Sequence, residues 1–295
     1  MKVAIEKDIA LWPGLPPGAK GVALANKLED FGGMTGHTPE TVATHIGRPF
    51  LNRYTPDRAN GTELLVIPGG GYGQVWFQKE GVEIADRFNA MGVTVSVLCY
   101  RLPGEGWQDR ADVPLQDAQR AMRLIRSRPG VDPARCGAMG FSAGGHLAAS
   151  LAVRGDAKVY EPVDAADKAD ARPAFAMLLY PVITMGEGTH AGSRDNLLGT
   201  DAAPAAIAAY SCEKLVSAKT PPVFLAQAVD DETVPFAANS LAFYQALQKA
   251  KVPSELHAFE AGRHGFALRD PDGKPWAAWP ELALAWAKSR GFVAG

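Results

Sequence analysis

The chain has 295 residues, of which 47% are hydrophobic and 21% charged, and its formal net charge is −2. These proportions are ordinary for a folded globular protein, and the near-neutral charge argues against electrostatic attraction to nucleic acid or to an acidic membrane. No apolar run approaches the roughly 18 residues that a membrane-spanning helix needs. Length alone favours two domains of roughly 150 residues each, although α/β folds often exceed that size.

The first 60 residues are an N-terminal extension rich in proline and glycine. Short candidate strands lie near residues 42–46 and 50–54, and we expect both to join the main sheet as antiparallel edge strands. The first eight residues lack the apolar core of a signal peptide. This favours a cytoplasmic location, with a signal removed before this sequence begins as the alternative.

After about residue 60, strand-like runs alternate with amphipathic helical patterns. The strand-like runs cover residues 64–68, 93–100, 136–141, 174–182, 222–229 and 255–259. Helical patterns cover residues 81–91, 114–126, 143–154 and 241–249. This alternation predicts an α/β fold, with a mostly parallel central sheet and helices on both faces. The stretch at residues 184–212 is a long insertion, either a lid over the site or a surface excursion with one short helix near residues 204–210.

The cysteines carry no sign of a metal site. Cys99, Cys136 and Cys212 have no C-x-x-C spacing, which indicates neither a disulfide framework nor a zinc site. We expect Cys99 and Cys136 to be buried, because both lie in apolar stretches. The sequence implies no metal and no cofactor.

A serine lies where a strand pattern meets a helical pattern, in the segment Gly140-Phe141-Ser142-Ala143-Gly144. This G-x-S-x-G pattern is typical of a nucleophile at a sharp strand-to-helix turn, where the flanking positions must be small. Backbone N–H groups of the following helix would face an oxyanion formed at Ser142. We therefore predict Ser142 as the nucleophile.

A serine hydroxyl needs a base, and in this architecture the acid and then the histidine follow the serine. His264 comes after the last strand pattern, at the edge where parallel sheets place their chemistry, whereas His257 lies inside that strand. His146 follows Ser142 on the helix and should point away from the hydroxyl. We predict His264 as the base.

The acid is expected after the run at residues 222–229, where Asp230, Asp231 and Glu232 follow one another. Asp231 lies three residues before Val234-Pro235, the offset of hydrolases with a D-x-x-V-P turn, and is favoured over Asp230. A glycine-rich loop after an early strand would complete the oxyanion hole. The predicted donors are the N–H of Ala143 and those of Gly70 and Gly71.

These motifs resemble those of the α/β-hydrolase superfamily, and in particular its acetyl-xylan-esterase-like branch of small carbohydrate esterases. The narrower resemblance rests on Leu11-Trp12-Pro13-Gly14, on Pro68-Gly69-Gly70-Gly71-Tyr72 and on Ser193 to Gly199. It implies a serine esterase that removes acetyl groups from xylan-derived or other acetylated sugars, with a small-molecule ester as its partner. The alternatives are a general short-chain carboxylesterase and a non-catalytic ligand-binding pseudohydrolase. A peptidase of the prolyl-oligopeptidase type is disfavoured, because it would need a large gating domain.

Aromatic side chains near the presumed catalytic edge suggest where a sugar could bind. Tyr72, Trp76 and Trp107 are the candidate substrate contacts, since a flat aromatic ring offers an apolar face to a sugar ring. Because Ser142, Asp231 and His264 must meet at one edge, we expect residues 1–295 to form one domain rather than two. The oligomeric state stays open.

Overall fold

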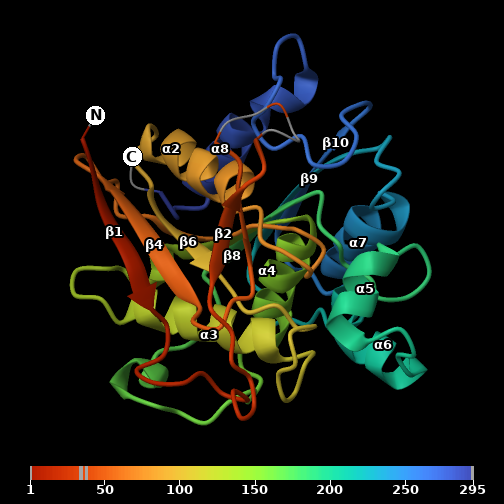
Figure 1. Cartoon of the computed structure of the whole chain (residues 1–295). Coiled ribbons are helices and arrows are strands. Elements are labelled where there is room, and N and C mark those ends of the chain that lie inside the picture. The colour runs from red at the N-terminus through yellow and green to blue at the C-terminus, as the bar shows by residue number, and fades with distance from the viewer. Residues whose placement is uncertain (1, 33–35, 37–38, 294–295) are drawn as a thin grey trace.

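A mostly parallel sheet runs through the centre of the chain (Figure 1). In the computed structural model, which describes residues 2–32, 36 and 39–293, its strands follow the order β1-β4-β6-β5-β7-β8-β9-β10. Strands β5 to β10 pair in parallel, while β4 pairs antiparallel with both β1 and β6. The bounds are β1 Val3–Ala10, β4 Phe50–Pro56, β5 Glu63–Ile67, β6 Thr94–Cys99, β7 Cys136–Phe141, β8 Phe175–Leu179, β9 Val223–Ala228 and β10 Ser254–Phe259.

The parallel strands confirm the predicted fold class. Strands β5 to β9 are buried along their whole length, which explains why they appear in the sequence as continuous apolar runs rather than alternating ones. All six predicted strands beyond residue 60 are present, with their ends shifted by a few residues in places. Their carboxyl ends bring the loops after β5, β7, β9 and β10 to one edge of the sheet.

Helices cover both faces of the sheet. Helices α3 (Val113–Arg126) and α4 (Ser142–Arg154) pack on one face, and α2 (Glu83–Asn89) and α8 (Trp279–Ser289) on the other (Figure 1). Helix α7 (Ala242–Lys249) lies beside β10. Helix α8 was not among the predicted helices. Trp279 fixes it in place, because its fully buried ring packs 5.8 Å from Phe88 of α2 and 6.0 Å from Phe141.

The N-terminal extension differs from the prediction in one strand. The segment predicted at residues 42–46 forms β3 (Thr41–Thr44), but β3 pairs with β2 (Lys27–Asp30) in a separate two-stranded sheet. The outer edge strand is instead β1, which the sequence did not mark because most of its side chains are exposed and several are charged. The second predicted strand is confirmed as β4, an antiparallel member of the main sheet.

The insertion at residues 184–212 carries two helices. The predicted short helix is present as α6 (Pro204–Tyr210), and a second helix, α5 (Ala191–Leu198), precedes it. All three cysteines are buried and unpaired, as expected for Cys99 and Cys136. In the described part of the chain, no helix is both long enough and apolar enough to cross a membrane.

Candidate active site

Ser142 stands at a strained turn between β7 and α4. Its backbone is left-handed, with φ at 53°, a conformation that a serine rarely adopts and that recurs at functional sites. Gly140 and Gly144 make the turn possible. A β-carbon at Gly140 would lie 2.2 Å from the Gly144 carbonyl oxygen, and one at Gly144 would lie 2.1 Å from the Ile67 oxygen.

The structure brings the predicted serine, histidine and aspartate into one hydrogen-bonded chain. His264 Nε2 lies 2.8 Å from Ser142 Oγ, and His264 Nδ1 lies 2.7 Å from Asp231 Oδ2. The Asp231 carboxylate can only accept, so Nδ1 carries the proton and Nε2 is free to accept the serine proton. The Tyr180 ring packs edge-on against the imidazole at 5.1 Å and limits its rotation.

Asp231 is held by hydrogen bonds around its carboxylate. Its Oδ1 accepts the backbone N–H groups of Thr233 at 3.0 Å and Val234 at 2.9 Å, and its Oδ2 accepts the Gln227 amide at 3.1 Å. The Asp231 side chain is fully buried. These bonds fix the orientation of the carboxylate and so that of the imidazole.

Asp230, the acid next to Asp231 in the sequence, has a structural role. Asp230 does not reach the imidazole. Its Oδ1 accepts the N–H groups of Gly262 at 2.9 Å and Arg263 at 2.8 Å, directly before His264. Asp230 therefore fixes the loop that carries His264.

The predicted oxyanion donors lie beside Ser142. Gly70 and Gly71 have φ values of 127° and 63°, and their N–H groups have no hydrogen-bond acceptor among the described residues. Ala143 lies in the first turn of α4, where N–H groups have no intrahelical partner. The Gly69 N–H, in contrast, donates to the buried Glu80 carboxylate at 2.7 Å, which anchors the start of the glycine loop.

Tyr72 anchors the glycine loop rather than facing a substrate. Its ring is buried, and its hydroxyl lies 2.7 Å from His146 Nδ1, while His146 Nε2 donates to the Tyr210 carbonyl at 2.8 Å. His146 thus points away from Ser142, as expected. The structure does not place Tyr72 in the cleft, because the loop turns its side chain inward against α4.

Trp107 also lies outside the cleft. It is buried, and its ring packs against the Arg101 guanidinium, 4.9 Å from the ring centroid. Arg101 in turn makes a fully buried ion pair with Asp117 at 2.8 Å. This buried pair holds Trp107 in the interior, and the structure does not place it against either cavity beside Ser142. Of the three aromatic residues predicted as substrate contacts, Trp76 alone lines the cavities beside Ser142 and His264.

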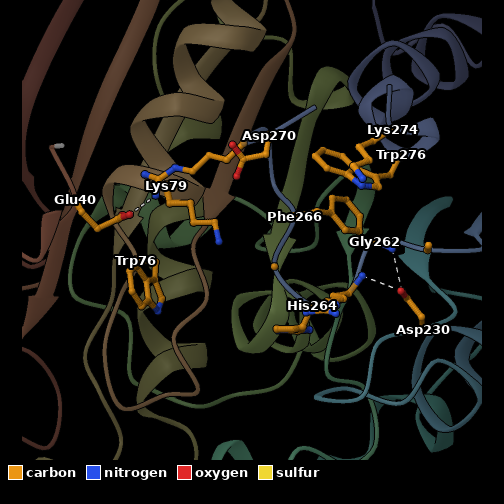
Figure 2. Close-up of a pocket in the computed structure, with 14 residues that line it drawn as sticks. Glu40, Trp76, Lys79, Asp230, Gly262, His264, Phe266, Asp270, Lys274 and Trp276 are labelled. Carbon is orange, nitrogen blue, oxygen red and sulfur yellow. Dashed lines mark hydrogen bonds and ion pairs between the residues drawn. The ribbon is translucent and has the colours of Figure 1, made fainter. Parts of the chain in front are cut away.

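Two adjoining cavities lie beside Ser142 and His264. A cavity of about 280 Å³, the acyl pocket, is lined by Ser142, Gly70, Gly71, Glu80, His190 and Thr233. A larger one of about 560 Å³, the outer cleft, is lined by aromatic and charged side chains (Figure 2). Trp76, Lys79, His264 and Gly265 line both. Their combined size suits a ligand larger than an acetyl group.

His190 is a pocket residue that the sequence did not single out for the site. It caps α5, with its Nδ1 accepting the Ser193 N–H at 3.2 Å and lying 2.8 Å from Ser193 Oγ. Burial, followed by the nearby charge of His264, lowers the pKa of His190. Its Nε2 therefore carries the proton and is a neutral donor. Only its position in the insertion after β8 could have pointed to it.

The fold and this arrangement define the class. A mostly parallel sheet with a serine at the turn between β7 and α4, and with an aspartate and a histidine at the same edge, is an α/β-hydrolase. The chain belongs to the prolyl oligopeptidase family of that superfamily, whose pattern matches residues 102–288.

Proteins similar to this chain include enzymes named for acetyl ester hydrolysis. An acetylxylan esterase from Xylanibacter ruminicola is 33% identical over 229 residues, covering 75% of this chain and 44% of that protein. The chain spans less than half the length of the curated relatives it matches. The structure of an acetyl ester-xyloside bifunctional hydrolase from Caldicellulosiruptor lactoaceticus is 34% identical, with a TM-score of 0.80 and coverage of 98% of this chain and 97% of that one.

A second solved structure is also similar. The carboxylesterase Cest-2923 from Lactobacillus plantarum is 27% identical, with a TM-score of 0.69 over 92% of this chain and 99% of that one. Together the comparisons confirm the resemblance to acetyl-xylan-esterase-like hydrolases. Among the described residues, no group of three or more His, Cys, Asp and Glu side chains is placed to hold a metal ion.

Proposed function

We propose that this chain is a serine ester hydrolase that removes acetyl groups from xylan-derived or other acetylated sugars. The observation that carries the proposal is the continuous hydrogen-bonded chain from Ser142 through His264 to Asp231. Beside it are N–H groups of the glycine loop that have no acceptor within the part of the chain that the structure describes. The relatives named for acetyl ester hydrolysis support the acetyl-sugar substrate class.

In the first half-reaction, Ser142 Oγ attacks the ester carbonyl carbon while its proton passes to His264 Nε2. The carbonyl oxygen becomes an oxyanion, which Ala143 and one or both of Gly70 and Gly71 stabilise through their N–H groups, at about 3–4 kcal/mol per donor. The bond to the alcohol oxygen then breaks. The alcohol leaves with the proton from His264, and the acyl group stays on Ser142.

In the second half-reaction, a water molecule attacks the acyl-enzyme and gives its proton to His264. The tetrahedral intermediate collapses, the acid is released and the proton returns to Ser142 Oγ. Asp231 stabilises the imidazolium in both halves. No step requires a cofactor.

A general short-chain carboxylesterase is the second candidate, and similarity to the Lactobacillus plantarum carboxylesterase favours it. Both functions use the same catalytic groups, and they differ in the alcohol part of the ester that is cleaved. Acetate release from acetylated xylo-oligosaccharides, compared with turnover of 4-nitrophenyl acetate and butyrate, separates them. A higher kcat/KM for the sugar acetates supports the first function, and a higher value for the aryl esters supports the second.

The Ser142→Ala and His264→Ala variants test the mechanism. Either change should lower kcat by about 10⁵-fold or more, because the nucleophile and the base act as a unit. His257→Ala is the matched control, since this histidine is a partly exposed residue on β10 bonded to Glu255. A folded Ser142→Ala protein with wild-type ester hydrolysis would contradict the mechanism. Failure of the wild-type serine to react with a fluorophosphonate would favour a non-catalytic pseudohydrolase.

A further inference from the structure

The outer cleft opens on one defined side of the triad. His264 and Gly265 line both cavities. Beyond them the outer cleft continues along Phe266, whereas Ser142, Gly70 and Gly71 line only the acyl pocket. In the proposed mechanism His264 must hand its proton to the alcohol oxygen, so that oxygen lies on the His264 side. The alcohol part of the substrate therefore extends into the outer cleft, and the acyl group occupies the acyl pocket.

The walls of the outer cleft suit sugar rings. Trp76 lies on one side, and Phe266 and Trp276 lie on the other (Figure 2). Phe266 and Trp276 stack with their centroids 5.0 Å apart and their planes at 26°. Phe266 and Trp276 are both buried and form a fixed wall, whereas the partly exposed Trp76 offers an accessible flat apolar face to a ring. A cavity of about 560 Å³ lies within the range of roughly 300–1,000 Å³ that holds complete small ligands, so it exceeds the need of one small alcohol.

Several charges in the outer cleft are already used by the protein. Arg269 forms ion pairs with Glu40 and Glu83. Asp230 accepts the two backbone N–H groups that fix the His264 loop. The Glu80 carboxylate, which faces the acyl pocket, is occupied by the Gly69 N–H and by the Tyr180 hydroxyl at 2.9 Å.

Four charged side chains of the outer cleft have no hydrogen-bond or ion-pair partner among the described residues. They are three cations, Lys79, Arg263 and Lys274, and one anion, Asp270. Arg263, Lys274 and Asp270 are exposed at the rim, where solvent screens them. Lys79 differs from them, because it is half-buried and lies on the wall common to both cavities.

The Lys79 ammonium lies close to Gly265, the residue that follows His264. A β-carbon at Gly265, the residue after His264, would lie 3.5 Å from Lys79 Nζ. Figure 2 shows the amine pointing into the cleft between Trp76 and His264. An ammonium that projects into a cleft and has no partner among the described residues is available to pair with an anion of a bound ligand.

We propose that the alcohol part of the substrate is a sugar chain that carries a carboxylate, as a uronic acid substituent does, and that Lys79 pairs with this carboxylate. This inference rests on the proposed esterase function and specifies its substrate class. Lys79 then selects acidic acetylated oligosaccharides over neutral ones, while the aromatic walls hold the rings.

Two matched substrates test the proposal. One is an acetylated xylo-oligosaccharide with a glucuronic acid substituent, and the other is the same compound with its carboxyl reduced to an alcohol. Wild-type kcat/KM should favour the acidic compound by about tenfold at low salt, as a charge-assisted hydrogen bond provides, and less at high salt. Lys79→Met should bring the ratio to about one. Lys79→Arg should retain most of it. The control Lys249→Met, at an exposed lysine of α7 that lines neither cavity, should leave it unchanged.

Three outcomes would overturn the proposal: equal wild-type turnover of both compounds, a preference that survives Lys79→Met, or a Lys79 effect confined to esters with an acidic acyl group. Calorimetric binding of the two deacetylated products to Ser142→Ala separates this proposal from the esterase function. Tighter binding of the acidic product, lost in Lys79→Met, supports the subsite even if no ester is cleaved. Equal binding of both products refutes it even if esters are cleaved.

Discussion

Two histidines near the nucleophile show how surroundings decide the role of a residue. His264 lies between Ser142 and Asp231 and is arranged to move a proton. His146, four residues after Ser142 on α4, is buried and hydrogen-bonded to the Tyr72 hydroxyl and the Tyr210 carbonyl. Burial lowers the pKa of His146 to about 4. His146 is therefore neutral near pH 7 and holds the glycine loop in place.

The lowered pKa of His146 predicts acid sensitivity of the fold. The unfolded histidine binds a proton near pH 6.5, whereas the folded one does so only near pH 4, so the unfolded state gains protons first as the pH falls. This site should lower the free energy of unfolding by about 2 kcal/mol between pH 7.5 and pH 5. Most of the further decrease in the free energy of unfolding from this site should occur between pH 5 and pH 4.

Urea unfolding at several pH values measures this effect. His146→Gln removes the titrating group while keeping a polar side chain of similar reach, so the slope of stability against pH should become shallower. His190, whose pKa is also lowered, contributes to the slope of stability against pH in both the wild type and His146→Gln. An unchanged slope in His146→Gln would show that His146 does not titrate as its burial implies.

At the scale of elements, the glycine loop is held from two sides. Tyr72 fixes it to α4 from within, and Asn196 of α5 donates to the Gly71 carbonyl at 2.8 Å from the insertion. Arg110 in turn donates to the carbonyls of Asp195 and Asn196 and holds α5. The insertion thus shapes the site through His190 and Asn196. The interpretation of this insertion as a lid stays a prediction.

Removing the Asn196 contact should loosen the predicted oxyanion hole. We expect Asn196→Ala to lower kcat about tenfold with little change in KM, because misplaced donors weaken transition-state binding more than substrate binding. Arg194→Ala is the control for damage to the helix. Arg194 lies on α5 close to Asn196 and forms an ion pair with Asp195. Steady-state kinetics on one acetyl ester provide the measurement. An increase in KM with unchanged kcat would show that Asn196 acts in substrate binding instead.

At the scale of the molecule, we propose that residues 1–295 form one domain. Strands β1 and β10 lie at opposite edges of the same sheet. The N-terminal extension is tied to the core by Trp12, whose Nε1 donates to the buried Asp117 at 2.8 Å, and by Arg120, which donates to the Leu11 carbonyl. Near the other end, Thr62 donates to the Phe292 carbonyl.

One domain predicts one cooperative unfolding transition. Circular dichroism and tryptophan fluorescence should report the same midpoint in urea, because the tryptophans are spread from Trp12 to Trp286 and sense both ends of the chain. Two separate transitions, or different midpoints for the two signals, would contradict a single domain.

Local chemistry explains which features were predictable. The strand and helix alternation follows from the spacing of apolar residues, and the serine turn from glycines that tolerate no side chain. Asp231 and His264 could be chosen because each follows a strand, and parallel strands end at one edge. Strand β1 was missed because its exposed, charged residues form no apolar pattern. Helix α8 was missed although its tryptophans are buried.

The sequence by itself determined the fold class and the candidate nucleophile, acid and base, since these depend on periodicity, on tight turns and on the order of strands. Only the tertiary structure decided which side chains face the cleft. Tyr72 and Trp107 turn inward toward His146 and Arg101, while His190 and Lys79 reach the cavities from other elements. The physical reason is that a loop side chain is oriented by partners distant in sequence, and no local pattern records those partners.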